Sequence, residues 1–140
     1  MPGRRLRGDA GVATTEFVIA APAFLLMLLL IVQVGLWFHG ISVASAAAQD
    51  GARAASLEGA DPGVGETVAE RFCADLAPHL LSGVDARQTG DADVVRVTVT
   101  AQVVGVFALP GVNMSLPVHE TAQRSVEVFR PAGDVPPPRS

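Results

Sequence analysis

Cysteine is almost missing from this 140-residue chain, and lysine and tyrosine are missing altogether. The single cysteine, Cys73, cannot form a disulfide within the chain, so any folded domain must be held together by packing. The region from residue 40 onward carries seven arginines against twelve aspartates and glutamates. This acidic balance provides no basic stripe, and we therefore exclude nucleic acid as a partner.

Charge is also absent from a run of 22 residues, 17–38, in which nearly every side chain is apolar. About 20 apolar residues in a helix cover the roughly 30 Å hydrocarbon core of a bilayer. A helix also satisfies its own backbone hydrogen bonds there. The sequence therefore predicts a single-pass protein of the cell membrane.

The charges on either side of this run predict its orientation. Arg4, Arg5 and Arg7 precede it, whereas the first charges after it are of both signs. Basic flanking residues stay on the cytoplasmic side of a membrane. We therefore expect a cytoplasmic amino terminus and place residues 40–140 outside.

A short motif lies immediately before the apolar run. Gly11 is followed by four residues, then by Glu16 and Phe17, with Pro22 soon after. A glycine lacks Cβ, so its backbone can lie extended against a protease surface. Ionisable residues at the edge of a span are commonly functional, because an unpaired carboxylate in hydrocarbon is costly. A simpler interpretation of Glu16 is a solvated residue that favours the start of a helix through the helix dipole.

Together with the small-residue run 46–55, this motif resembles the TadE-like family of the tight-adherence (Flp) pilus and secretion system, especially its actinobacterial type. The resemblance covers about residues 7–57, and it extends more loosely to the head through the Val/Thr-rich strand and the segment Leu116-Pro117-Val118. It implies a non-enzymatic minor pseudopilin that assembles with other pilin or pseudopilin subunits, either in the secretion apparatus or in a surface filament.

The resemblance also implies cleavage by a prepilin peptidase on the cytoplasmic face. By the motif, Gly11 would be the last leader residue and Val12 the new amino terminus. Glu16 would be the acidic residue that follows the cleavage site. Gly8 is a second candidate for the last leader residue. Two other interpretations stay open: an uncleaved anchor that carries an extracellular binding module, and a secreted protein released near Ala46 by signal peptidase.

Small residues recur at spacings of three and four after the span. Such a stripe lets the backbone of a second helix approach closely, and we interpret it as a helix-packing surface between subunits. The alternative is that alanine is simply a good helix former. The residues of the stripe are Gly40, Ala44, Ala48, Gly51 and Ala55.

The predicted fold class is α+β: a long amino-terminal transmembrane helix that extends into a small head. We divide the chain into a basic leader (1–11), a transmembrane and extended helix (12–57), an extracytoplasmic head (58–130) and a disordered proline-rich tail (131–140). The head is predicted to contain one helix and a three-stranded antiparallel sheet.

Periodicity supports both parts of the head. Spacing by four predicts a helix with one apolar face, and alternation over residues 95–103 predicts a strand. Flanking strands are expected near 84–88 and 116–128. Pro78 is expected to kink or shorten this helix, and Gly83 to end it. The apolar face of the predicted helix consists of Val68, Phe72, Leu76 and Leu80.

The sequence offers little for catalysis. His39, His79 and His119 do not lie at ligand spacing, and no Cys-x-x-Cys accompanies them. Cys73 reads as a small buried apolar residue, and Asp91 with its neighbour Asp93 as part of a turn. We therefore expect no enzyme activity, no cofactor, no metal and no small-molecule substrate.

Overall fold

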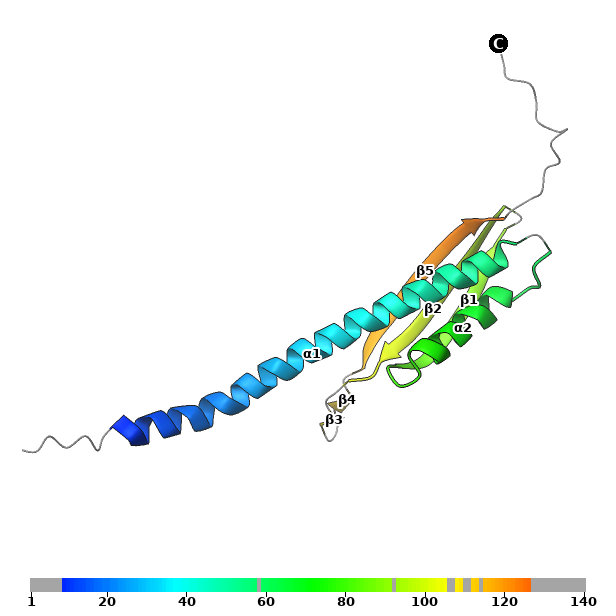
Figure 1. The fold of residues 1–140 in the computed structure, drawn as a ribbon. Helices are drawn as coiled ribbons and strands as arrows, with labels where there is room; N and C mark the ends of the chain where they lie inside the picture. The colour runs from blue at the N-terminus through cyan, green and yellow to red at the C-terminus, as the bar shows by residue number, and fades with distance from the viewer. Residues whose placement is uncertain are drawn as a thin grey trace, which may run out of the picture.

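A computed structural model describes residues 9–57, 59–91, 93–105, 108–109, 112–113 and 115–126. It consists of one very long helix, a shorter helix and a three-stranded antiparallel sheet. The second half of the long helix and the shorter helix lie on the same face of the sheet (Figure 1). The predicted α+β class is confirmed.

The long helix α1 runs from Asp9 to Ala55 and includes Pro22. Its 47 residues correspond to a rod of about 70 Å. The first half projects away from the rest of the molecule, and the second half lies along the sheet (Figure 1). The span and the head are therefore joined by one continuous helix and not by a linker.

The second helix, α2, runs from Val64 to Leu76, and it is shortened before Pro78, as the sequence predicted. It ends before Pro78, because the residue preceding a proline is disfavoured in helical conformation, and Ala77 is accordingly non-helical. The helix begins after Gly63, which has a φ of 82° and provides no side-chain cap.

The buried face of α2 differs in part from the predicted one. Gly65, Ala69 and Cys73 are buried, whereas Leu76 is 58% exposed. Leu80 lies beyond the end of the helix. Small residues take the inner face because α1 packs against it too closely for larger side chains. Phe72 is half-buried and packs against the core, so the predicted apolar face was right for Phe72 and wrong for Leu76.

The main sheet contains β1 (Leu81–Gly90), β2 (Val94–Val103) and β5 (Leu116–Ser125), in the order β1-β2-β5. The predicted three antiparallel strands are confirmed. Gly83 does not end a helix as predicted; it lies within β1, with a φ of 61°, where the pairing with β2 shifts. A short ribbon of β3 (Ala108–Leu109) and β4 (Val112–Asn113), which the sequence analysis did not predict, lies between β2 and β5 in the chain.

The core is built from valines on the sheet and small residues on the helices. Val97, Val99 and Val103 are fully buried on the inner face of β2, as the alternation predicted. They meet residues of α1 such as Ala44 and Ala52, which are also fully buried. The second half of α1 is therefore part of the head.

The closest approach of the two helices is at Gly51. A Cβ placed on Gly51 would lie 2.5 Å from the carbonyl oxygen of Gly65 and 3.2 Å from both Ala69 and Val97. The nearest of these atoms belongs to the backbone of α2, so no side-chain rotation can move it away. Only glycine fits at this position without moving one helix.

We expect Gly51→Ala to destabilise the head by about 1 to 3 kcal/mol, because the added methyl group overpacks the contact between α1 and α2. Gly35→Ala is the matched control, since a Cβ on Gly35 would meet nothing within 4 Å. Thermal unfolding in detergent, followed by circular dichroism, measures both. An unfolding temperature for Gly51→Ala at or above that of the control would contradict this packing.

Candidate functional site

The residues of the leader motif lie at the free end of α1. The backbone is helical from Asp9, and both Gly11 and Val12 lie in this first part of the helix. Glu16 is exposed. The structure therefore places the three predicted processing residues on one continuous helix, at the end opposite the head (Figure 1).

The apolar part of α1 that follows is uncovered. Phe17 and Ile19 are each 71% exposed, and most side chains stay exposed as far as Val32, whereas Gln33 is buried. The most apolar window of the helix has a mean hydropathy of 2.7 and is only 6% buried. Such a surface is unfavourable in water and favourable in lipid. The helix is long and apolar enough to cross a membrane once.

The small-residue stripe lies on the head side of α1. A Cβ on Gly40 would collide with the side chain of Val103 on β2. Ala44 and Ala48 are 0% and 1% exposed. Together with Gly51 and the 6% exposed Ala55, they form a continuous buried line along the helix.

This stripe is therefore a packing surface within the chain. Its residues contact the sheet and α2, which already satisfies the need for small side chains. Packing of another subunit on the same stripe is untested by a single chain and stays a prediction. The opposite face of α1 is accessible, since Ser42, Gln49, Asp50 and Arg53 are exposed on it.

That outer face of α1 lines an open groove of about 560 Å³. Phe72 of α2 borders it on one side and Arg124 of β5 on the other. Hydroxyl, amide and charged groups of α1 line its floor. The groove is open and polar, and it holds charges of both signs, which is more typical of a protein contact than of a small-molecule site.

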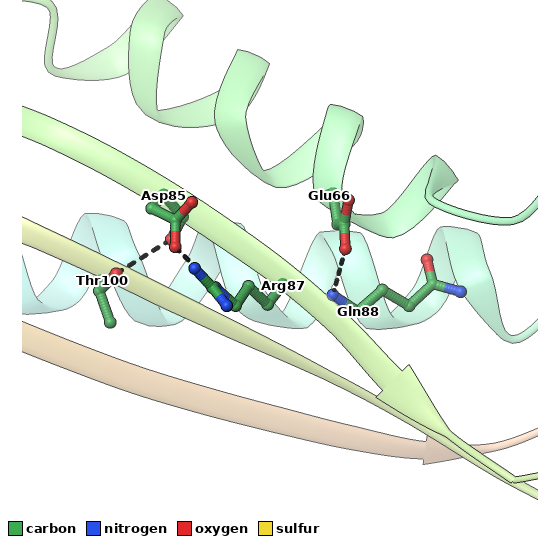
Figure 2. A network of polar contacts seen from close by, with 5 residues as sticks. All are labelled: Glu66, Asp85, Arg87, Gln88 and Thr100. Atoms are coloured by element: carbon green, nitrogen blue, oxygen red, sulfur yellow. Dashed lines mark hydrogen bonds and ion pairs between the residues drawn. The ribbon is translucent and has the colours of Figure 1, made fainter.

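A polar contact joins the start of α2 to β1. Glu66 Oε1 accepts a hydrogen bond of 2.8 Å from the backbone N–H of Gln88, as Figure 2 shows. In return, the backbone N–H of Gly65 donates to Gln88 Oε1 at 2.9 Å. Each residue thus satisfies a backbone donor on the neighbouring element. The sequence analysis missed both residues, because no local pattern links positions 22 apart.

A second polar cluster lies earlier in β1, before Gln88. Arg87 Nε donates to Asp85 Oδ2 at 3.0 Å, and Thr100 Oγ1 donates to the carbonyl oxygen of Asp85 at 3.2 Å (Figure 2). Hydrogen bonding to Asp85 raises the pKa of Arg87. Both side chains of this ion pair are exposed to solvent, so the pair contributes little to the stability of the fold.

The side chains with catalytic potential are not brought together. Cys73 is 1% exposed, and burial, aided by the negative charge of Glu70, raises the pKa of its thiol. A raised pKa means less of the reactive thiolate. Among the residues that the structure describes, no group of three or more His, Cys, Asp or Glu side chains could hold a metal ion.

The comparison with known families bears on this same helix. Residues 11–53 match the family model described as TadE-like protein. This segment is similar to the TadE-like family. No curated protein and no solved structure matches the chain.

The TadE-like segment begins at Gly11 and ends two residues before the end of α1. It contains Glu16, the exposed apolar run and all but the last residue of the buried stripe. The family resemblance is therefore confirmed for the helix, and α2 and the sheet lie outside the matched residues.

We expect Glu66→Ala to destabilise the head by about 1 to 2 kcal/mol, because it leaves the Gln88 N–H without its acceptor. Glu66→Gln should stay close to the parent, since an amide oxygen can accept the same bond. Urea unfolding in detergent compares the two. Equal stability of Glu66→Ala and the parent would show that water replaces the carboxylate at no cost.

Proposed function

We propose that this chain is a non-enzymatic, pseudopilin-like membrane subunit of a tight-adherence (Flp) pilus assembly or secretion system. The observation that carries the proposal is the family match at residues 11–53, which coincides with the exposed apolar helix and its entry into the head. A continuous helix of this kind suits a subunit that is held in the membrane and presents a head at a fixed distance from it.

The proposed topology has a cytoplasmic amino terminus and the head outside the cell membrane. The arginines at positions 4, 5 and 7 support it, because basic flanking residues are retained in the cytoplasm. The peptidase would then meet the cytoplasmic end of the helix. Alternatives are an uncleaved anchor with a binding head and a protein secreted after cleavage near Ala46.

Processing by a prepilin peptidase is the second part of the proposal. Cleavage at the Gly11–Val12 bond requires an extended backbone, and this bond lies within the first turn of α1. The first N–H groups of a helix have no intrahelical acceptor, and the first turn unwinds at low cost. Glycine lowers the cost further, because it favours helix less than other residues.

Glu16 has a role in this scheme after cleavage. The new ammonium at Val12 would lie four residues before the Glu16 carboxylate, which is about one turn of helix. The same ammonium could come from a neighbouring subunit. Either pairing neutralises a carboxylate at the edge of the hydrocarbon, where an isolated charge is costly.

The amino terminus of the protein extracted from its native membranes tests the proposal. We expect a chain that starts at Val12, or at Asp9 if Gly8 is the last leader residue, and Gly11→Leu should move or abolish the cleavage. Mass spectrometry of the intact protein measures this. A terminus at Met1 or Pro2 would support an uncleaved anchor, and one at Ala47 or Gln49 a secreted protein; either result rejects the pseudopilin.

Glu16→Gln removes the charge at nearly constant shape, so we expect it to reduce assembly with partner subunits while insertion continues. The loss should be about 1 kcal/mol if water reaches the pair and several kcal/mol if lipid shields it. Glu16→Asp should be intermediate, because the charge remains on a shorter side chain. Co-purification of partner subunits measures the effect.

The control for this series is Asp75→Asn, which removes an exposed carboxylate of α2 that lies away from the leader motif and does not line the groove. Full assembly and full leader removal in Glu16→Gln would remove the proposed role of this residue.

A further inference from the structure

The two outer edges of the sheet differ in how many backbone groups they leave open. In the order β1-β2-β5, β1 and β5 are the edge strands of the described sheet. An edge strand exposes N–H and C=O groups to which another strand can bind. Folded proteins usually block such edges, so an open one indicates an interaction surface.

The edge at β1 is interrupted at two of its outward N–H groups. The outward N–H of Gln88 donates to Glu66 Oε1, and the N–H of Leu81 donates to the carbonyl oxygen of Ala77 at 3.1 Å. The pairing of β1 with β2 also shifts between Ser82 and Asp85, which bends the strand. A partner strand could not form a regular ladder along it.

The edge at β5 is regular over its whole length. All ten residues of β5 pair with β2 without a shift. The N–H of Val126 donates to the carbonyl oxygen of Asp93 at 2.9 Å, so the backbone of Val126 faces β2. Antiparallel pairing alternates along a strand, so Arg124 and every second residue before it also face β2.

The other residues of β5 therefore direct their backbone groups outward. Pro117 is one of them, which is consistent with proline being tolerated where no ladder bond needs its missing N–H. Within the part of the chain that the structure describes, nothing accepts a hydrogen bond from the outward N–H groups. These belong to His119, Thr121, Gln123 and Ser125, which are all exposed.

Antiparallel pairing of β5 with the same strand of a second copy conflicts with membrane anchoring. A Cβ on Gly40 would meet Val103 and one on Gly51 would meet Val97, so β2 runs opposite to α1 and β5 runs with it. Two antiparallel β5 strands would direct their α1 helices in opposite directions. Two copies in one membrane with one orientation cannot do this.

Two other arrangements of identical copies are also unfavourable. In a two-fold symmetric parallel pair of β5 strands, each residue lies opposite its own copy, so N–H faces N–H and C=O faces C=O. Pairing of β5 with β1 of the next copy keeps the α1 helices aligned, but it meets the edge that Glu66 and Ala77 already interrupt. Self-association is therefore disfavoured at β5.

We propose that the outer edge of β5 binds an extended segment of a different protein, which adds a fourth strand to the sheet. Backbone hydrogen bonds to the four outward N–H groups provide the contact. On the helix-covered side, Glu120 and Arg124 lie four residues apart. The bound segment therefore carries a basic residue near Glu120 and an acidic residue near Arg124, and no proline where its own N–H meets β5.

The inference rests on the proposed function at one step: an antiparallel pair of β5 strands is excluded only if both copies are anchored in one membrane.

The experiment uses the full-length protein in its native membranes, with a photo-reactive residue in place of Ser125. Thr121→Pro and Gln123→Pro each remove one outward N–H, as Pro117 already does without breaking the ladder to β2. The matched controls, Thr121→Val and Gln123→Val, change the same side chains and keep the N–H.

We expect an adduct with a different protein in the parent and in both valine variants, and at least a tenfold loss of that adduct in the proline variants. An adduct with a second copy, no adduct in the parent, or equal adducts in the proline and valine variants would each overturn the proposal. Loss in the valine variants as great as in the proline variants would also overturn it, because recognition would then depend on side chains.

Two further measurements keep the result interpretable. If the proline variants unfold at a lower temperature than the parent, amide hydrogen exchange of the unaltered protein is measured instead. Slower exchange at Thr121 and Gln123 in native membranes than in detergent supports strand addition. Equal exchange in the two environments opposes it. Extraction by alkaline carbonate tests anchoring separately. Release of the parent would reject the membrane subunit, and the adduct pattern would still decide the edge.

Discussion

The contact between the α1 backbone and the head is the constraint on which the rest of this structure depends. Gly51 meets the backbone of α2 at Gly65, and Gly40 meets Val103 on β2. Ala44 and Ala52 fill the space between with no exposed surface. Because these side chains are minimal, the helix lies directly on the sheet and on α2. The head thereby has no freedom to swing about a linker, and its position relative to the span is fixed by the helix itself.

This arrangement determines which surfaces are available to other proteins. The small-residue stripe is buried against the head, whereas the outer face of α1, most of the apolar run and the β5 edge of the sheet stay accessible. Glu66 and Gln88 have two effects, since they fasten α2 to β1 and also occupy a backbone donor at that edge. The opposite edge at β5 has no comparable cover in the described residues. One end of the molecule is thus suited to lipid and one side of the head to a partner strand.

Much of the fold followed from local sequence patterns. Alternation in β2 predicted its buried valines, and the long apolar run predicted the exposed helix, because burial and lipid exposure both follow hydrophobic periodicity. The prediction failed in part for α2. Its larger apolar residues, such as Leu76, suggested the inner face, yet Ala69 and Cys73 occupy it. A periodic pattern identifies an apolar stripe, but the distance to the opposing helix decides which side chains can enter the contact.

The sequence by itself determined that the chain has one uncharged run long enough to span a membrane, an acidic region after it, and a glycine and a glutamate just before it. These properties depend on residues close together in the chain. Only the tertiary structure decided that the small-residue stripe faces the chain's own head, that Glu66 reaches Gln88, and that β5 rather than β1 keeps an open edge. Those features depend on residues more than 20 positions apart, and their contact follows from how close the helices and strands pack.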